Sequence, residues 1–339
     1  SKDIKIKEDI LEEVVRCYGF EKVPLTLPLL TPTPFDFSPV TRNQKIKYFL
    51  AHAAHMTEQQ SYAMFDEQFI ASLGLQPRVA VSVVNPVSEN YSRMATSLVP
   101  GLLKNIKENH VQRDQLAFFE SARVWQWLDK EPVERKQVAG IFFKKRSTVD
   151  FYHCKYQLNN LLAMLGFDHD IVNWKKLTTQ QEPWYQAYQS AQLIYENRVI
   201  GVAGKGDPAF ISKLDIDTEC DAFIFELDAD FLLTHQPGIS QFVPLSKYQQ
   251  TSFDVSLFVP LTLEAAAIKA TITTVDTLIK HVELVDFFEK TAAGAATSRA
   301  LTFRVWLGSD ARTLEKNDLD VVRQAVVGAV EKLGATVRV

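Results

Sequence analysis

The stretch Asp254-Val255-Ser256-Leu257-Phe258-Val259 decides the fold of the last hundred residues. Polar and apolar side chains alternate along it, as they do in a strand with one buried face. The segments that follow predict a helix, two strands joined by small residues at 291–296, a second helix and a closing strand, over residues 263–278, 281–288, 300–307, 314–333 and 335–339. This βαββαβ order predicts a ferredoxin-like module.

Two residues of the second predicted strand, Asp286 and Phe288, stand two positions apart. Alternation along a strand places both side chains on the same face of the sheet. An exposed ring can stack on an unpaired base, and a carboxylate can accept hydrogen bonds from a base edge. The open sheet face of such a module is a familiar platform for nucleic acid, so the pair is a candidate nucleic-acid contact, and the alternative for Phe288 is an aromatic residue of the core.

Composition limits the partners of this chain of 339 residues. Lys and Arg number 37 against 41 Asp and Glu, so the net charge is −4 and any nucleic-acid contact must be local. We expect no DNA partner. There is no apolar run of membrane-spanning length, so no membrane is expected, and three cysteines without a CxxC motif favour a reducing, cytoplasmic location.

The region before the last module predicts an α+β fold. Strands are expected at 80–84, 116–127, 138–143, 190–195, 199–203 and 222–228, and helices at 40–55, 98–110 and 150–165. Strand follows strand without regular helical crossovers, which favours an antiparallel sheet. Because the chain opens on strand-like residues 3–6 without Met, we expect a piece of a longer polypeptide.

Four acidic residues lie near the start of the chain: Asp3, Asp9, Glu12 and Glu13. The last three have i, i+3 and i+4 spacing, which puts them on one face of a helix expected from residue 8 to residue 18. Converging carboxylates are the ligands that Mg²⁺ prefers. The alternative is a solvated acidic helix start, which also suits the helix dipole.

Several motifs, in this order, resemble the β subunit of bacterial-type phenylalanyl-tRNA synthetase, over nearly the whole chain. They are Asp9-Ile10-Leu11-Glu12-Glu13 running to Tyr18-Gly19-Phe20, Met94-Ala95-Thr96-Ser97-Leu98-Val99-Pro100-Gly101-Leu102-Leu103, Phe119-Glu120-Ser121-Ala122-Arg123-Val124-Trp125, and Leu284-Val285-Asp286-Phe287-Phe288. The chain departs from the family pattern at Ala95, Ala122, His153, Gln249 and Phe253. These departures leave details of the interfaces open.

The resemblance implies four parts: the end of a helical metal-binding module (1–24), a Pro-rich linker (25–39), a catalytic-like but non-catalytic class II synthetase domain (40–242) and a ferredoxin-fold anticodon-binding domain (243–339). It implies Mg²⁺ ligands at Asp3, Asp9, Glu12 and Glu13, and anticodon contacts at Asp286 and Phe288. Arg299, Arg304 and Arg312 are candidates for contacts with the RNA backbone, and the alternative is that they only form a solvated face.

The function implied is that of a subunit of phenylalanine-tRNA ligase. Such a subunit supports the catalytic α subunit in an (αβ)₂ assembly and binds the anticodon of tRNA(Phe), while the whole assembly uses ATP to form Phe-tRNA. This chain carries no catalytic residue in that scheme, so we expect it to be inactive alone. The alternative is a non-catalytic RNA-binding paralogue that has no synthetase partner.

Overall fold

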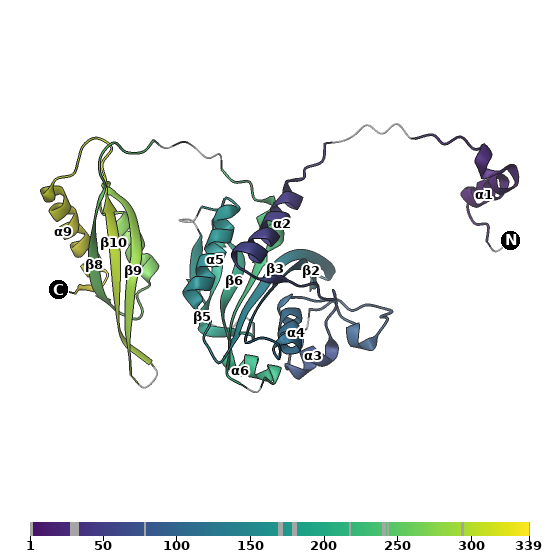
Figure 1. Cartoon of the computed structure of the whole chain (residues 1–339), viewed down its shortest axis with the longest axis horizontal. Helices are drawn as coiled ribbons and strands as arrows, with labels where there is room; N and C mark the ends of the chain where they lie inside the picture. Colours follow the sequence, from purple (N-terminus) through teal and green to yellow (C-terminus); the bar gives the residue numbers. More distant parts are fainter. Residues whose placement is uncertain are drawn as a thin grey trace. The chain divides into compact units, whose positions relative to one another are not determined.

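The computed structural model describes residues 3–27, 34–77, 79–168, 172–177, 182–216, 218–238, 242, 244–292 and 295–338. The chain divides into two compact units, Ser1–Ile239 and Ser240–Val339 (Figure 1). Each unit has its own β-sheet and its own hydrophobic core. In the part of the chain that is described, no helix has the length and apolar character needed to cross a membrane.

The first unit begins with helix α1 (Lys7–Tyr18) and the short turn η1 (Phe20–Lys22). The strand expected at residues 3–6 is wrong. The carboxylate of Asp9 instead accepts the backbone N–H groups of Lys5 (2.7 Å) and Ile6 (3.0 Å), which folds these residues over the first turn of the helix. Gly19, at φ 103°, ends α1 in a conformation that favours glycine.

A seven-stranded sheet of order β1-β2-β3-β7-β6-β5-β4 forms the centre of this unit. Only β1 pairs in parallel, with β2, and all other pairs are antiparallel. The predicted α+β class is therefore confirmed. The strands are β1 (Thr57–Glu58), β2 (Gln115–Leu128), β3 (Glu131–Lys145), β4 (Asn173–Lys176), β5 (Tyr185–Tyr195), β6 (Arg198–Gly206) and β7 (Cys220–Asp228).

Helices pack on both faces of this sheet, and alternation along β7 shows why. Phe223 and Phe225 contact one core cluster, whereas Ala222 and Ile224 contact the other. The first cluster includes residues of α2 (Ser38–Tyr48) with its π-helical continuation η2 (Phe49–Ala53), α5 (Phe151–Met164) and α7 (Ala229–Thr234). The second includes α4 (Val99–Asn109), α6 (Pro208–Ile211), the end of α3 (Glu67–Ser72) and η4 (Ser212–Leu214) (Figure 1).

The strand expected at residues 80–84 is also wrong. Only Ser82 forms a bridge there, with Arg93. Two further backbone hydrogen bonds, Val83 N–H to Ser92 and Met94 N–H to Val81, flank the bridge. The short 3₁₀ turn η3 (Glu89–Tyr91) lies between the segments that contain Ser82 and Arg93. Alternating side chains at residues 80–84 predicted a strand, but they did not show that its pairing is limited to one bridge.

The second unit has the predicted βαββαβ order. Its elements are β8 (Thr251–Val259), α8 (Ala265–Thr273), β9 (Ile279–Ala292), β10 (Ala295–Leu307), α9 (Lys316–Lys332) and β11 (Thr336–Val337), and the sheet order is β11-β8-β10-β9. Ile268 of α8 and Val326 of α9 are fully buried against strand residues such as Phe303. Both helices thus cover one face, and among the described residues no helix covers the other.

Candidate nucleic-acid interface

The uncovered face of the second sheet carries both residues singled out in the sequence. Asp286 pairs with Thr302 and Phe288 pairs with Ala300 across the β9–β10 ladder. Directly opposed residues of an antiparallel pair point to the same side of the sheet. Because Leu301 and Phe303 of β10 point into the core, Thr302 and Ala300 point away from it, and Asp286 and Phe288 do the same.

An irregularity in β9 sets this orientation. Leu284 pairs with Phe303, yet Asp286 pairs with Thr302, so Val285 is one extra residue on β9. Such a bulge reverses the alternation of a strand beyond it. Leu284 accordingly lies on the side of the core, whereas Asp286, two positions later, lies on the outer face.

The outer face offers two exposed aromatic rings. Phe288 is 61% exposed, and Phe258 of β8, which is 47% exposed, pairs with the same Ala300 from the other side. Neighbouring strands lie about 4.8 Å apart, so the backbones that carry the two rings are separated by roughly 10 Å, with the small residue Ala300 between them. The outer face therefore offers two aromatic rings that unpaired bases can stack on.

A cation adjoins the second ring. The guanidinium of Arg338 lies 5.9 Å from the centre of the Phe258 ring, and the Arg338 backbone N–H donates to Ser256. Sequence reasoning missed Phe258 and Arg338. The available signal was the aromatic Phe258 at a polar-side position of the alternating stretch that begins at Asp254.

The three candidate arginines occupy different places. Arg304 lies on the outer face, where its Nε and Nη2 nitrogens donate to Asp254 at 2.7 and 2.8 Å, and this ion pair lowers the pKa of Asp254. Arg299 is on the opposite side of β10 and donates to the carbonyls of Pro260 and Leu263. Arg312 follows β10 and pairs with Asp318 at 2.6 and 2.8 Å. Only Arg304 of the three shares the face of Asp286.

The acidic residues near the N-terminus do not form a metal centre in this structure. Within the described ranges, no group of three His, Cys, Asp or Glu side chains is placed to hold a metal ion. The Asp9 carboxylate is occupied by two backbone N–H groups, which lower its pKa, and Glu13 accepts from Arg16 at 2.9 Å. The magnesium site therefore stays a prediction from the sequence.

Comparison with known families agrees with the architecture of both units. A family model described as a ferredoxin-fold anticodon binding domain matches residues 246–338. The class defined by the second unit is thus that of ferredoxin-fold anticodon-binding domains. A second model, described as the phenylalanyl tRNA synthetase beta chain CLM domain, matches residues 23–229. Since this match covers more than half of the chain, the chain belongs to the phenylalanyl-tRNA synthetase β-chain family.

Curated relatives carry the same name. The chain is 27% identical over 99% of its length to a phenylalanine–tRNA ligase β subunit of Listeria monocytogenes, and 29% identical over 99% to that of Carboxydothermus hydrogenoformans. It spans 42% and 43% of those two proteins, about two fifths of their length. A pyrrolysyl-tRNA synthetase structure from Desulfitobacterium hafniense is similar to this chain with 10% identity and a TM-score of 0.46, over 57% of this chain and 67% of that one.

Proposed function

We propose that this chain is the part of a phenylalanine–tRNA ligase β subunit that supports the catalytic α subunit and binds the anticodon of tRNA(Phe). Family membership and the names of the relatives support the assembly, for which we propose an (αβ)₂ arrangement in the cytoplasm with ATP-dependent Phe-tRNA formation. The chain alone is proposed to be inactive. No step of this proposal depends on Mg²⁺.

One observation carries the RNA-binding part of the proposal. Phe288 is an aromatic ring exposed over 61% of its surface, on an uncovered sheet face, two positions from the exposed carboxylate of Asp286. Exposing such a ring to water is unfavourable unless a partner covers it. A purine stacked on Phe288 would bring its Watson–Crick edge towards Asp286, which can accept from the N–H groups of guanine.

The test is binding of a fluorescent tRNA(Phe) anticodon stem-loop to the wild-type chain and to two variants. Phe288→Ala removes the stacking surface, which is worth about 1–3 kcal/mol per base, so the dissociation constant should rise about 5- to 150-fold. Asp286→Asn should raise the dissociation constant of the wild-type loop less than Phe288→Ala does. It should also reduce the preference for guanine over adenine at the contacted position.

A matched control is Phe242→Ala, which removes another exposed phenylalanine, 89% exposed, that lies outside the sheet. This variant should bind with wild-type affinity. If Phe288→Ala binds as tightly as Phe242→Ala, the anticodon assignment is wrong. Co-purification with an α subunit separately tests the structural role.

The alternative, an RNA-binding paralogue without a synthetase partner, is not favoured. The curated relatives reported above match 99% of the chain and are named as ligase β subunits. A paralogue would be recovered without an α subunit, and phenylalanine-dependent pyrophosphate exchange by the isolated chain would contradict the proposed inactivity.

A further inference from the structure

A pocket of about 820 Å³ lies in the first unit, on the face of the seven-stranded sheet that α4 covers. Its floor is Glu226 of β7, whose register partners are Ala139 of β3 and Val202 of β6. Because Ala139 and Val202 have short side chains, they leave space above the sheet beside the Glu226 carboxylate. A buried carboxylate at the centre of a sheet is unfavourable unless its oxygens are satisfied.

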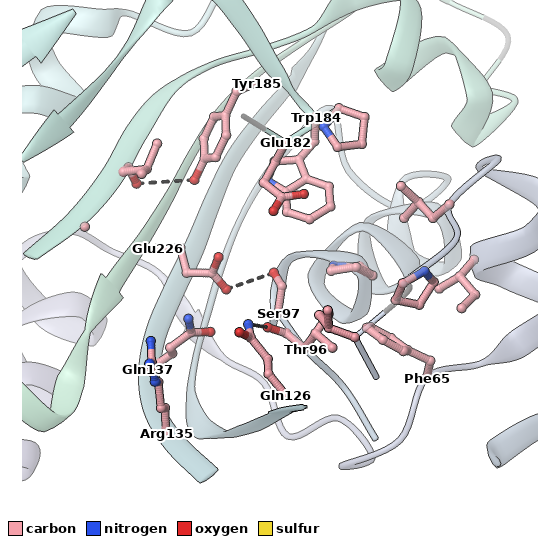
Figure 2. A pocket seen from close by; sticks show the side chains of 18 of the residues that line it. Phe65, Thr96, Ser97, Gln126, Arg135, Gln137, Glu182, Trp184, Tyr185 and Glu226 are labelled. Atoms are coloured by element: carbon pink, nitrogen blue, oxygen red, sulfur yellow. Dashed lines mark hydrogen bonds between the residues drawn. The ribbon is translucent and has the colours of Figure 1, made fainter. Parts of the chain in front are cut away.

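The Glu226 carboxylate is held in a fixed position. The hydroxyl of Ser97 (2.8 Å) and the backbone N–H of Leu98 (3.1 Å) both donate to its Oε1 oxygen (Figure 2). Burial, with a smaller contribution from the nearby Glu182, raises the pKa of Glu226 to about 7, although the hydrogen bonds from Ser97 and Leu98 oppose this rise. Glu182 lies at the mouth of the pocket, where surrounding protein also raises its pKa. A cation between these two acids would relieve both effects.

Two other polar atoms of the lining are left without a hydrogen-bond partner of regular geometry among the described residues. They are the indole N–H of Trp184, a residue only 4% exposed, and the Oε1 oxygen of Gln137. The Trp184 N–H lies near enough to the Tyr185 hydroxyl to oppose, weakly, the rise in the pKa of Tyr185 that burial causes. The Tyr185 hydroxyl itself donates to the carbonyl of Val202 at 3.2 Å.

Unpaired buried donors and acceptors cost free energy, and a ligand that pairs with them recovers it. A ligand that pairs with the Trp184 N–H needs a hydrogen-bond acceptor. A ligand that pairs with the Gln137 Oε1 oxygen and with the two carboxylates needs N–H donors. Phe65 and Ile70 add an apolar part to the lining, and Phe65 lies across the pocket from Gln137 in Figure 2.

We propose that this pocket binds a small organic amine that carries a hydrogen-bond acceptor near its ammonium group. The ammonium group lies between Glu226 and Glu182 and donates to Gln137, the acceptor takes the Trp184 N–H, and an apolar arm contacts Phe65 and Ile70. This site is distinct from the outer face of the second unit.

The probes are three compounds of similar size, titrated into the full chain by calorimetry and by ligand-observed NMR. They are 2-amino-1-phenylethanol, which has both groups, 2-phenylethylamine, which lacks the acceptor, and 1-phenyl-1,2-ethanediol, which lacks the amine. The amino alcohol should bind most tightly. Loss of the amine should weaken binding at least about tenfold and loss of the hydroxyl about threefold, as expected for charged and neutral hydrogen bonds.

Variants assign each contact. Glu182→Gln, at the exposed mouth, keeps the fold and should reduce the preference for the amine, and Glu226→Gln should remove most of it. Trp184→Phe should remove the preference for the hydroxyl. Glu219→Gln changes an exposed glutamate outside this pocket and should leave all three affinities unchanged.

Two results would overturn the proposal: no saturable binding of the amino alcohol at millimolar concentration, or equal affinity for amine and diol in the wild-type chain. Binding that survives both Glu182→Gln and Glu226→Gln would place the ligand elsewhere, which also contradicts it. RNA binding by the Glu182→Gln variant should match wild type, so the outcome is independent of the anticodon proposal.

Discussion

Two glutamates on the same face of the seven-stranded sheet, Glu120 and Glu226, have carboxyl groups that the surrounding protein shields from water. Glu120 of β2 is 3% exposed, and burial raises the pKa of its carboxyl group although Ser61 donates its backbone N–H at 2.7 Å. Glu226 of β7 is more exposed than Glu120, but burial raises the pKa of its carboxyl group as well. Both groups therefore tend to keep a proton at a pH at which an exposed glutamate has lost it.

This property predicts a pH-dependent stability for the first unit. The pKa of Glu226 is about 7 when folded and near 4.5 when unfolded, so the folded state binds the extra proton between these values. Stability must then fall as the pH rises from 4.5 through 7. Glu226→Gln mimics the protonated group and should be more stable than wild type at pH 8, by up to about 3 kcal/mol.

Urea unfolding at pH 5 and pH 8 checks this expectation. At pH 5 the two proteins should unfold at nearly the same urea concentration, because the wild-type group is already protonated. A difference that is the same at both pH values would mean that the amide, not the charge, accounts for the change.

At the scale of elements, packing inside the large sheet is close where aromatic residues meet a glycine. Gly140 of β3 pairs with Phe119 on one side and Phe225 on the other. A Cβ atom at Gly140 would lie 2.4 Å from the Phe225 ring and 2.9 Å from the Met56 methyl. These neighbours are buried and have no free space into which to move.

Gly140→Ala should therefore destabilise the first unit by about 1–3 kcal/mol, the usual cost of overpacking a core. Thermal unfolding followed by circular dichroism measures the change.

Gly328→Ala is the matched control. Gly328 lies within α9, and no atom is within 4 Å of the position that its Cβ would take. The same substitution should stabilise the second unit by about 0.5–1 kcal/mol, since alanine favours a helix. If both variants were destabilised equally, crowding at Gly140 would not be the cause.

Element order was predictable from the sequence because periodicity reports which side chains a single element buries. Residues 254–259 predicted β8 (Thr251–Val259), and residues 314–333 predicted α9 (Lys316–Lys332). Pairing was less predictable, since it depends on partners far along the chain. The short bridge at Ser82 and the extra residue at Val285 both belong to this second category.

The candidate sites show the same division. Asp286 and Phe288 were found because two functional residues share one strand, whereas Arg338 reaches Phe258 only through the pairing of β11 with β8. The pocket around Glu226 joins residues from positions 65 to 228, so no local pattern could indicate it.

At the scale of the whole molecule, the chain is acidic, yet it belongs to a family with an anticodon-binding domain. On the outer face, Arg304 is paired with Asp254, and Arg338 lies over Phe258. Stacking and base contacts, not charge, should therefore supply most of the affinity for RNA by this chain.

This balance predicts a weak dependence of binding on salt. Each phosphate neutralised on a single strand contributes about −0.7 to the slope of log affinity against log salt, so one or two contacts give a slope of about −1. Titration of the anticodon stem-loop at several KCl concentrations measures it. A slope steeper than about −3 would reveal a basic surface that these residues do not provide.

The extra residue in β9 has a consequence for how such chains can vary. Without Val285, Leu284 and Asp286 would be consecutive residues opposite Phe303 and Thr302, which are already consecutive on β10, so Asp286 and Phe288 would stay on the outer face. One residue inserted between Asp286 and Phe288 would instead put the carboxylate and the ring on opposite faces of the sheet. Such chains can therefore lose the bulge and keep this surface, whereas the two-residue spacing of the carboxylate and the ring has to be preserved.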